Sequence, residues 1–131
     1  MSDNSKQTEL SQERKYLEER VDARVTFLVL FLSASSLAIN TISSAKPEFT
    51  YLAFITSFVF ASLLSLSVIR TQRVVMAIIK RMKSECPDHP YIVATRNISF
   101  PPHAGFFTGY AVPVFLLVVY ASMGFIFSWL N

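Results

Sequence analysis

The sequence predicts an all-α integral membrane protein with three transmembrane helices, the first two of which have long cytoplasmic extensions. The prediction rests on where the charges are absent. Three stretches of the 131-residue chain, 25–45, 50–69 and 97–131, contain no Asp, Glu, Lys or Arg. Each is long enough for the roughly 20 apolar residues that a helix needs to cross a bilayer core about 30 Å thick. Charged residues make up only 16% of the chain, against about a quarter in soluble domains.

The orientation follows from the distribution of Lys and Arg. Five of the twelve precede the first span, one lies in the turn at Lys46, six fall in 70–96, and none follows. A chain with its N-terminus in the cytoplasm and its C-terminus outside therefore keeps eleven of twelve on the cytoplasmic side, as the positive-inside rule requires. We expect a single multi-pass domain in a bacterial inner membrane.

The N-terminal segment 8–24 reads as a cytoplasmic helix, because it contains no Gly or Pro and is rich in Glu, Leu, Arg and Lys. Thr8 or Ser11 could cap its first turn. No residue interrupts it before the first span, 25–45, so one helix is expected from about Thr8 to Ser43. One apolar stripe at helical spacing consists of Leu10, Leu17, Val21, Val25 and Leu28. The stripe either borders a solvated helix or packs on a neighbouring subunit or on the basic segment.

The second half of the first span is rich in small and hydroxylated residues, including Ser36, and contains Asn40, the most polar residue of any span. In membranes such residues mark helix–helix contacts, so both are candidates for helix packing or oligomer contacts. Alternatively, Asn40 lies near the interface and meets water.

A turn at 45–49 contains Pro47, which cannot continue a helix, so the first two spans should be antiparallel neighbours. In the second span, 50–69, small residues recur at every fourth position, which makes one face suitable for close helix contact. These residues are Ser57, Ala61 and Ser65.

The helix should continue past the second span as a cytoplasmic amphipathic helix over 70–84, because no breaker occurs before Pro87. Its predicted apolar arc contains Val74, Val75, Ile78, Ile79 and Met82. Its basic arc contains Arg70, Arg73, Lys80, Arg81 and Lys83. The segment either lies along anionic headgroups or, as we expect, runs straight on and packs on the first helix. The basic residues are candidates for binding lipid headgroups or a partner.

Residues 85–102 are expected to form a cytoplasmic loop, since four prolines disfavour regular helix; a short extended stretch could occur at 91–93. The third span, 104–130, begins with the GxxxG pair Gly105 and Gly109, which permits close approach of another helix.

Pro113 follows one turn later and predicts a kink in the third span. Trp129, close to its end, is typical of residues that meet the membrane interface.

Enzymatic chemistry is not supported. Every acidic residue lies in a charged flanking segment or in the turn, so no pair of carboxylates is placed for catalysis. Cys86 and His89, with His103, make only a weak zinc pattern, and we expect no metal or other cofactor. No ionisable residue lies within a span, which argues against a proton-coupled transporter. The net charge is +3, but the basic residues flank the predicted membrane spans, so direct nucleic-acid binding is not expected.

One architectural resemblance remains. The run Leu17-Glu18-Glu19-Arg20 followed by Arg24, leading into a hairpin of two spans, resembles the SLATT type of small bacterial membrane effectors. That resemblance implies anti-phage defence and an oligomer that disrupts the membrane or forms a channel. The hypothesis is a homo-oligomeric effector or sensor, embedded in membrane lipids, with a cytoplasmic protein partner on the basic segment. The alternative is a non-conducting accessory or anchoring subunit of a larger membrane complex.

Overall fold

A computed structural model describes residues 3–96 and 107–130, and every element in these two ranges is helical. The elements are α1 (Asp3–Ala45), the 3-10 helix η1 (Pro47–Phe49), α2 (Thr50–Glu85), α3 (Pro90–Arg96), the π-helix η2 (Phe107–Ala111) and α5 (Val112–Leu130).

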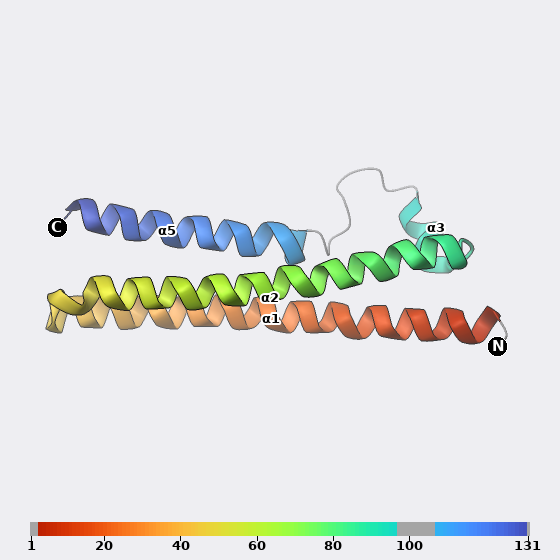
Figure 1. The fold of residues 1–131 in the computed structure, drawn as a ribbon, viewed down its shortest axis with the longest axis horizontal. Coiled ribbons are helices and arrows are strands. Elements are labelled where there is room, and N and C mark those ends of the chain that lie inside the picture. The colour runs from red at the N-terminus through yellow and green to blue at the C-terminus, as the bar shows by residue number, and fades with distance from the viewer. Residues whose placement is uncertain (1–2, 97–106, 131) are drawn as a thin grey trace.

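Two long helices form an antiparallel hairpin along the whole molecule (Figure 1). Their lengths of 43 and 36 residues correspond to about 65 and about 54 Å at 1.5 Å per residue. α5 lies beside only one half of the hairpin and packs mainly on α2 (Figure 1). The N-terminus and the corner between α2 and α3 therefore lie at one end, and η1 and the C-terminus at the other.

α1 is continuous because it contains no Gly or Pro, and it ends just before Pro47. The helix starts at Asp3, and the Thr8 hydroxyl donates to the carbonyl of Asn4 at 2.9 Å from inside the helix. The expected cap at Thr8 or Ser11 is therefore wrong, because nothing in the preceding residues stops the helix. α1 ends at Ala45, since Lys46 leaves helical geometry ahead of Pro47.

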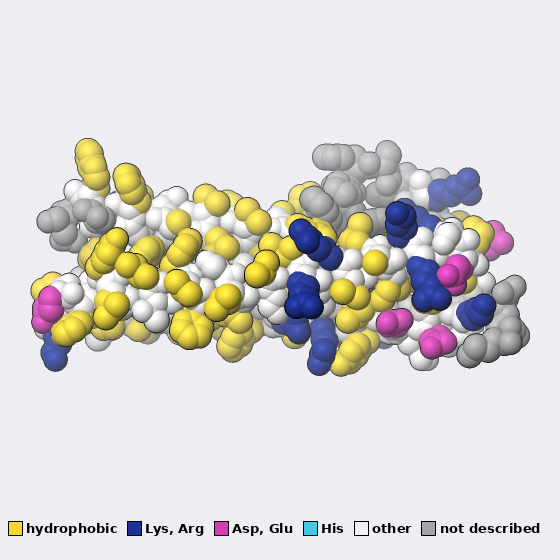
Figure 2. Space-filling view, in the orientation of Figure 1, with side chains coloured by type: hydrophobic (Ala, Val, Ile, Leu, Met, Phe, Trp, Pro, Cys, Tyr) yellow, Lys and Arg dark blue, Asp and Glu magenta, His cyan; other side chains and the backbone are white. Residues whose placement is uncertain are grey.

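The molecule divides into two halves of different surface. We call residues 25–69 and 107–130 the apolar half, and residues 3–24 and 70–96 the stalk. Charged side chains gather on the stalk and hydrophobic ones on the apolar half (Figure 2). Among the described residues, the exposed large hydrophobic side chains outside the apolar half are only Tyr16, Val74 and Val93.

The apolar half exposes far more hydrophobic surface than a soluble monomer tolerates. Its three helical stretches are long and apolar enough to cross a membrane. They belong to α1, to η1 with α2, and to η2 with α5, in agreement with the three predicted spans.

Side chains from both long helices build the core of the stalk. One cluster contains Leu10, Ile78 and Met82, and a second contains Val21 and Val75 with their neighbours. The 70–84 segment thus continues α2 and packs its apolar side on α1, as expected. Val74 is an exception: it is 46% exposed, because it lies at the border of the predicted arc.

The prediction of an irregular loop after α2 needs correction. Residues 90–96 form the helix α3, where an irregular loop with an extended stretch at 91–93 was expected. Pro90 is the first residue of α3, a position at which the missing N–H costs no hydrogen bond. Pro113 is the second residue of α5, just after the π-helix η2, and the kink predicted there stays a prediction.

Candidate functional site

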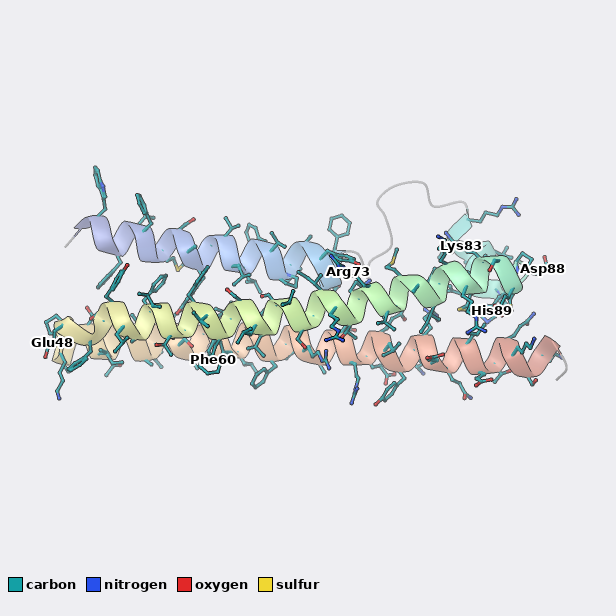
Figure 3. The ribbon with its side chains drawn as sticks, viewed as in Figure 1. Glu48, Phe60, Arg73, Lys83, Asp88 and His89 are labelled. Atoms are coloured by element: carbon teal, nitrogen blue, oxygen red, sulfur yellow. The ribbon has the colours of Figure 1, made fainter. Side chains whose placement is uncertain are left out.

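The exposed face of the stalk is basic. The five side chains of the predicted basic arc are all exposed: Arg70, Arg73, Lys80, Arg81 and Lys83. Arg73 lies near the start of α5 and Lys83 near the end of the stalk (Figure 3). This row is therefore presented outward by a helix whose opposite side is held in the core of the stalk.

One cation of this row is partly neutralised. Nε of Arg81 donates to Oε1 of Glu85 at 2.8 Å, and this bond and the carboxylate charge raise the pKa of Arg81. Because both groups are exposed, the pair contributes little to stability. The basic face therefore remains accessible to an anionic group.

The tip of the stalk is closed by α3. The guanidinium of Arg14 lies 3.8 Å from the ring centroid of Tyr91 and pairs with Glu18 at 2.9 Å. Burial, followed by the charge of Glu18, raises the pKa of Tyr91. Ile92 enters the same apolar cluster as Cys86. These contacts join α3 to both long helices and make the tip one packed unit.

A polar junction lies where the stalk meets the apolar half, and we define it as Arg24, Ser67, Thr71 and Gln72. Nη1 of Arg24 donates to the carbonyl oxygen of Ser67 at 3.2 Å, to its Oγ at 2.9 Å and to Oγ1 of Thr71. Gln72 is 2% exposed and lies against Gly109. The junction thus connects α1, α2 and η2 at one level of the molecule.

Sequence reasoning missed the polar junction. Arg24 is the last charged residue before the first span, and Ser67 lies near the end of the second, so the antiparallel hairpin brings them to the same level. That alignment is the signal that could have identified the pair. Nothing in the sequence pattern marks Gln72 as buried.

The small-residue ladder of α2 makes contacts within the chain. Ala61 is fully buried in a cluster with Leu28 and Leu32 of α1 and Tyr120 of α5. Ser65 is 1% exposed, and Ser57 is half-buried. The face predicted to contact the first span therefore meets the third helix as well.

Ser36 and Asn40 are exposed on α1 and are not part of a closed helix contact. Both line a cavity of about 380 Å³ between α1, α2 and α5. The hydroxyl of Ser36 donates to the carbonyl of Leu32 at 2.8 Å. Other hydroxyls of this half of α1 also bond to the carbonyl four residues before: Ser33, Thr41 and Ser44.

The remaining candidates are placed as follows. Gly109 is buried, whereas Gly105 lies outside the described residues. Cys86 is buried, and Nδ1 of His89 accepts a hydrogen bond from the N–H of Tyr91 at 3.2 Å. His103 lies outside the described residues. In the described ranges, no three His, Cys, Asp or Glu side chains are grouped to hold a metal.

No family model, curated protein or solved structure matches this chain.

Proposed function

We propose that this chain is a multi-pass membrane protein that holds a rigid basic stalk on the cytoplasmic side, as an accessory subunit that docks a cytoplasmic protein. The observation that carries the proposal is the packed core of the stalk. Leu10, Met82 and Ile92 bury the apolar side of α2 against α1 and α3, so the basic side, bordered by Val74, faces outward. A helix that lay on headgroups would keep its apolar side free for lipid.

Membrane insertion is supported by the exposed hydrophobic surface of the apolar half. In lipid that surface needs no cover, because hydrocarbon is as apolar as the side chains. The charge distribution supports a cytoplasmic stalk, since eleven described Lys and Arg residues lie in the stalk and Lys46 lies at the opposite end.

Single-cysteine labelling tests the orientation. Cys86 is the only cysteine, so Cys86→Ser provides a background for Lys83→Cys and Glu48→Cys, which lie at opposite ends (Figure 3). In intact bacterial cells, a membrane-impermeant maleimide should label Glu48→Cys, and Lys83→Cys only after lysis. Labelling of both or of neither before lysis would contradict the topology.

Site-specific photo-crosslinking tests docking. A photoreactive residue placed at Lys83 should give discrete protein adducts in cells, because the basic face meets the partner there. The matched control is Leu63, which is 58% exposed in the apolar half and should label lipid only. Charge reversal at Lys80 should abolish the Lys83 adducts. Equal adducts with and without charge reversal would contradict electrostatic docking.

A second candidate, a homo-oligomeric pore or membrane-perturbing effector in bacterial defence, is favoured by one face of α1. Thr26, Ser33, Asn40 and Ser44 are all exposed and fall within an arc of about 40° at 100° per residue. A polar face uncovered in the protomer is suited to subunit contact or to lining a pore. The resemblance to SLATT-type effectors points to the same function.

Dye leakage from liposomes tests this second candidate. A pore lined by this face of α1 predicts leakage that changes with Asn40→Leu, and less with Ser36→Leu, because Ser36 lies outside the arc and its hydroxyl bonds to the carbonyl of Leu32. Thr56→Val is the control, because Thr56 is an exposed hydroxyl residue on α2, bonded to its own backbone at 2.9 Å. If vesicles release no dye with the wild type or with any variant, a pore is excluded and the docking function is the remaining proposal.

A further inference from the structure

The excess positive charge of the stalk is confined to the level where the stalk meets the apolar half. It comes from four residues that we call the arginine collar: Arg20, Arg24, Arg70 and Arg73. Asp22 is the only acid in the two segments that these arginines bracket. Farther out, residues 3–19 and 74–96 contain seven Lys and Arg residues and seven acids, so their formal charges cancel. Figure 2 shows Lys and Arg side chains gathered where the hydrophobic surface ends.

The hairpin brings the four arginines to one level of the molecule. The hydrogen bonds of the polar junction hold Arg24 of α1 opposite residues 67–71 of α2. Arg70 lies within this stretch, and Arg73 lies near the start of α5 (Figure 3). Arg20 is one turn before Arg24, on the same face of α1. Both long helices therefore contribute to the collar at the end of the apolar half.

Three guanidinium groups of the collar have no anionic partner among the described residues. Arg20, Arg70 and Arg73 are exposed, and the two ion pairs within the described ranges both lie farther out on the stalk. The guanidinium of Arg20 lies 5.2 Å from the ring centroid of Tyr16, a cation–π contact that neutralises no charge. Arg24 donates only to uncharged oxygens. The collar therefore keeps its full positive charge.

The depth of the collar matches a headgroup layer. A bilayer has a hydrocarbon core about 30 Å thick and a total thickness of about 40–45 Å, which leaves about 5–8 Å for the headgroups on each side. At 1.5 Å per residue, all four arginines lie within about 8 Å of the ends of the charge-free spans. Lys80, the next cation of α2, lies about 17 Å beyond its span, outside this layer by about a Debye length at physiological salt.

The residue type indicates the chemistry of the ligand. A planar guanidinium matches two oxygens of a phosphate group, whereas an ammonium group acts as a point charge. All cations of the collar are arginines, whereas four of the seven farther out are lysines. Anionic and zwitterionic phospholipids both contain a phosphate, but only an anionic lipid brings the net negative charge that compensates the excess charge of the collar.

We infer that the arginine collar binds the phosphate groups of anionic phospholipids in the cytoplasmic leaflet. The inference rests on the proposed membrane location, and it divides the basic row of α2 into two parts. Arg70 and Arg73 meet lipid. The other three residues remain for the cytoplasmic partner: Lys80, Arg81 and Lys83.

Electron spin resonance of spin-labelled lipids measures the preference. The full chain is reconstituted in phosphatidylcholine vesicles that contain a trace of spin-labelled phosphatidylglycerol or of phosphatidylcholine labelled at the same acyl carbon. The fraction of label with restricted motion gives the relative association constant of the two lipids. The wild type should prefer phosphatidylglycerol about fivefold, the effect expected from one net charge near the membrane surface.

Two variants that lose the same charge separate the collar from the rest of the stalk. The collar variant has three substitutions: Arg20→Gln, Arg70→Gln and Arg73→Gln. The control variant has three others: Lys80→Gln, Arg81→Gln and Lys83→Gln. The collar variant should have a preference of about one, because the remaining Arg24 and Asp22 have no net charge. The control variant should keep the preference of the wild type.

Further variants test the role of the guanidinium group and guard against misfolding. Lysine at the same three collar positions keeps the charge, so it should leave a preference that is smaller than that of the wild type. Circular dichroism should show the same thermal midpoint for all variants, because the substituted side chains are exposed. If the collar variant unfolds, Arg70→Gln and Lys80→Gln provide the same comparison with one charge, and only Arg70→Gln should lower the preference, by about twofold.

The outcomes distinguish the collar inference from the proposed function. A chain that does not incorporate into vesicles overturns membrane insertion and the collar inference together. A chain that incorporates but shows no preference overturns the collar inference alone, as does a control variant that loses as much preference as the collar variant. If the collar variant keeps the lipid preference but loses the photo-adducts at Lys83, the collar binds the protein partner and the inference is wrong.

Discussion

Gly109 lies where η2 meets α2, and its replacement by alanine tests whether close approach holds the third helix in place. A Cβ at this position would overlap with Cγ, Cδ and Oε1 of Gln72. Gln72 is only 2% exposed, so its side chain has no solvent-filled space into which to rotate. Either the side chain or the helix must therefore move.

Two opposing effects set the change in the free energy of unfolding that Gly109→Ala causes. Overpacking a filled interior costs about 1–3 kcal/mol. Replacing Gly by Ala in a helix returns about 0.5–1 kcal/mol through backbone entropy. Because all three overlapping atoms belong to one buried side chain, we expect overpacking to win and Gly109→Ala to destabilise the protein by about 1–2 kcal/mol.

A double-mutant cycle with Gln72→Ala provides the assay. The free energy of unfolding is measured in one detergent for the wild type, both single variants and the double variant. Gln72→Ala removes the overlapping atoms, so Gly109→Ala should be nearly neutral or stabilising in that background, with a coupling energy of about 1 kcal/mol or more. The reasoning fails if Gly109→Ala is as stable as the wild type, or loses the same free energy in both backgrounds.

Three further predictions concern the stalk and its junction. Met82→Ala should destabilise the protein by about 2–5 kcal/mol in chemical denaturation because Met82 is fully buried, whereas Val74→Ala should cost far less. Arg24→Ala should cost about 1.5–3 kcal/mol in the same assay, through loss of its hydrogen bonds to α2. The raised pKa of Tyr91 favours its neutral form in the folded state, so this stabilisation is complete below the ordinary pKa of about 10 and is lost as the pH rises through the folded-state pKa. Circular dichroism between pH 8 and 12 should show less alkaline unfolding for Tyr91→Phe, and no such gain for Tyr16→Phe, because Tyr16 is 55% exposed.

The length and direction of the long helices could be predicted because the relevant signals are local. The absence of Gly and Pro allowed continuous helices, and Pro47 marked the turn. The alternation of apolar and basic residues after Ile69 also predicted correctly that α2 packs on α1. These signals act within a few residues along one helix, so they have the same effect on local structure in any fold.

The details of the candidate sites could not be predicted, because they depend on which residues meet across helices. Gln72 is polar in sequence, but η2 covers it through the close approach at Gly109. Similarly, Pro90 is compatible with the first position of α3, but the contact that holds this helix joins Tyr91 to Arg14, which is distant in the chain. Hydrophobic periodicity contains no information about either contact.

The polar residues of α1 fall into two groups, according to whether a backbone carbonyl of the same helix accepts all of their side-chain hydrogen bonds. In hydrocarbon every donor needs an acceptor, and Ser33, Ser36 and Ser44 each find one in the carbonyl four residues before. Their abundance alone therefore requires no water-filled path. The amide of Asn40 is different, because its two donors and its acceptor exceed what one neighbouring carbonyl provides. Any account of α1 as a pore lining or a subunit contact consequently depends on Asn40 rather than on the serines that made this helix conspicuous in the sequence.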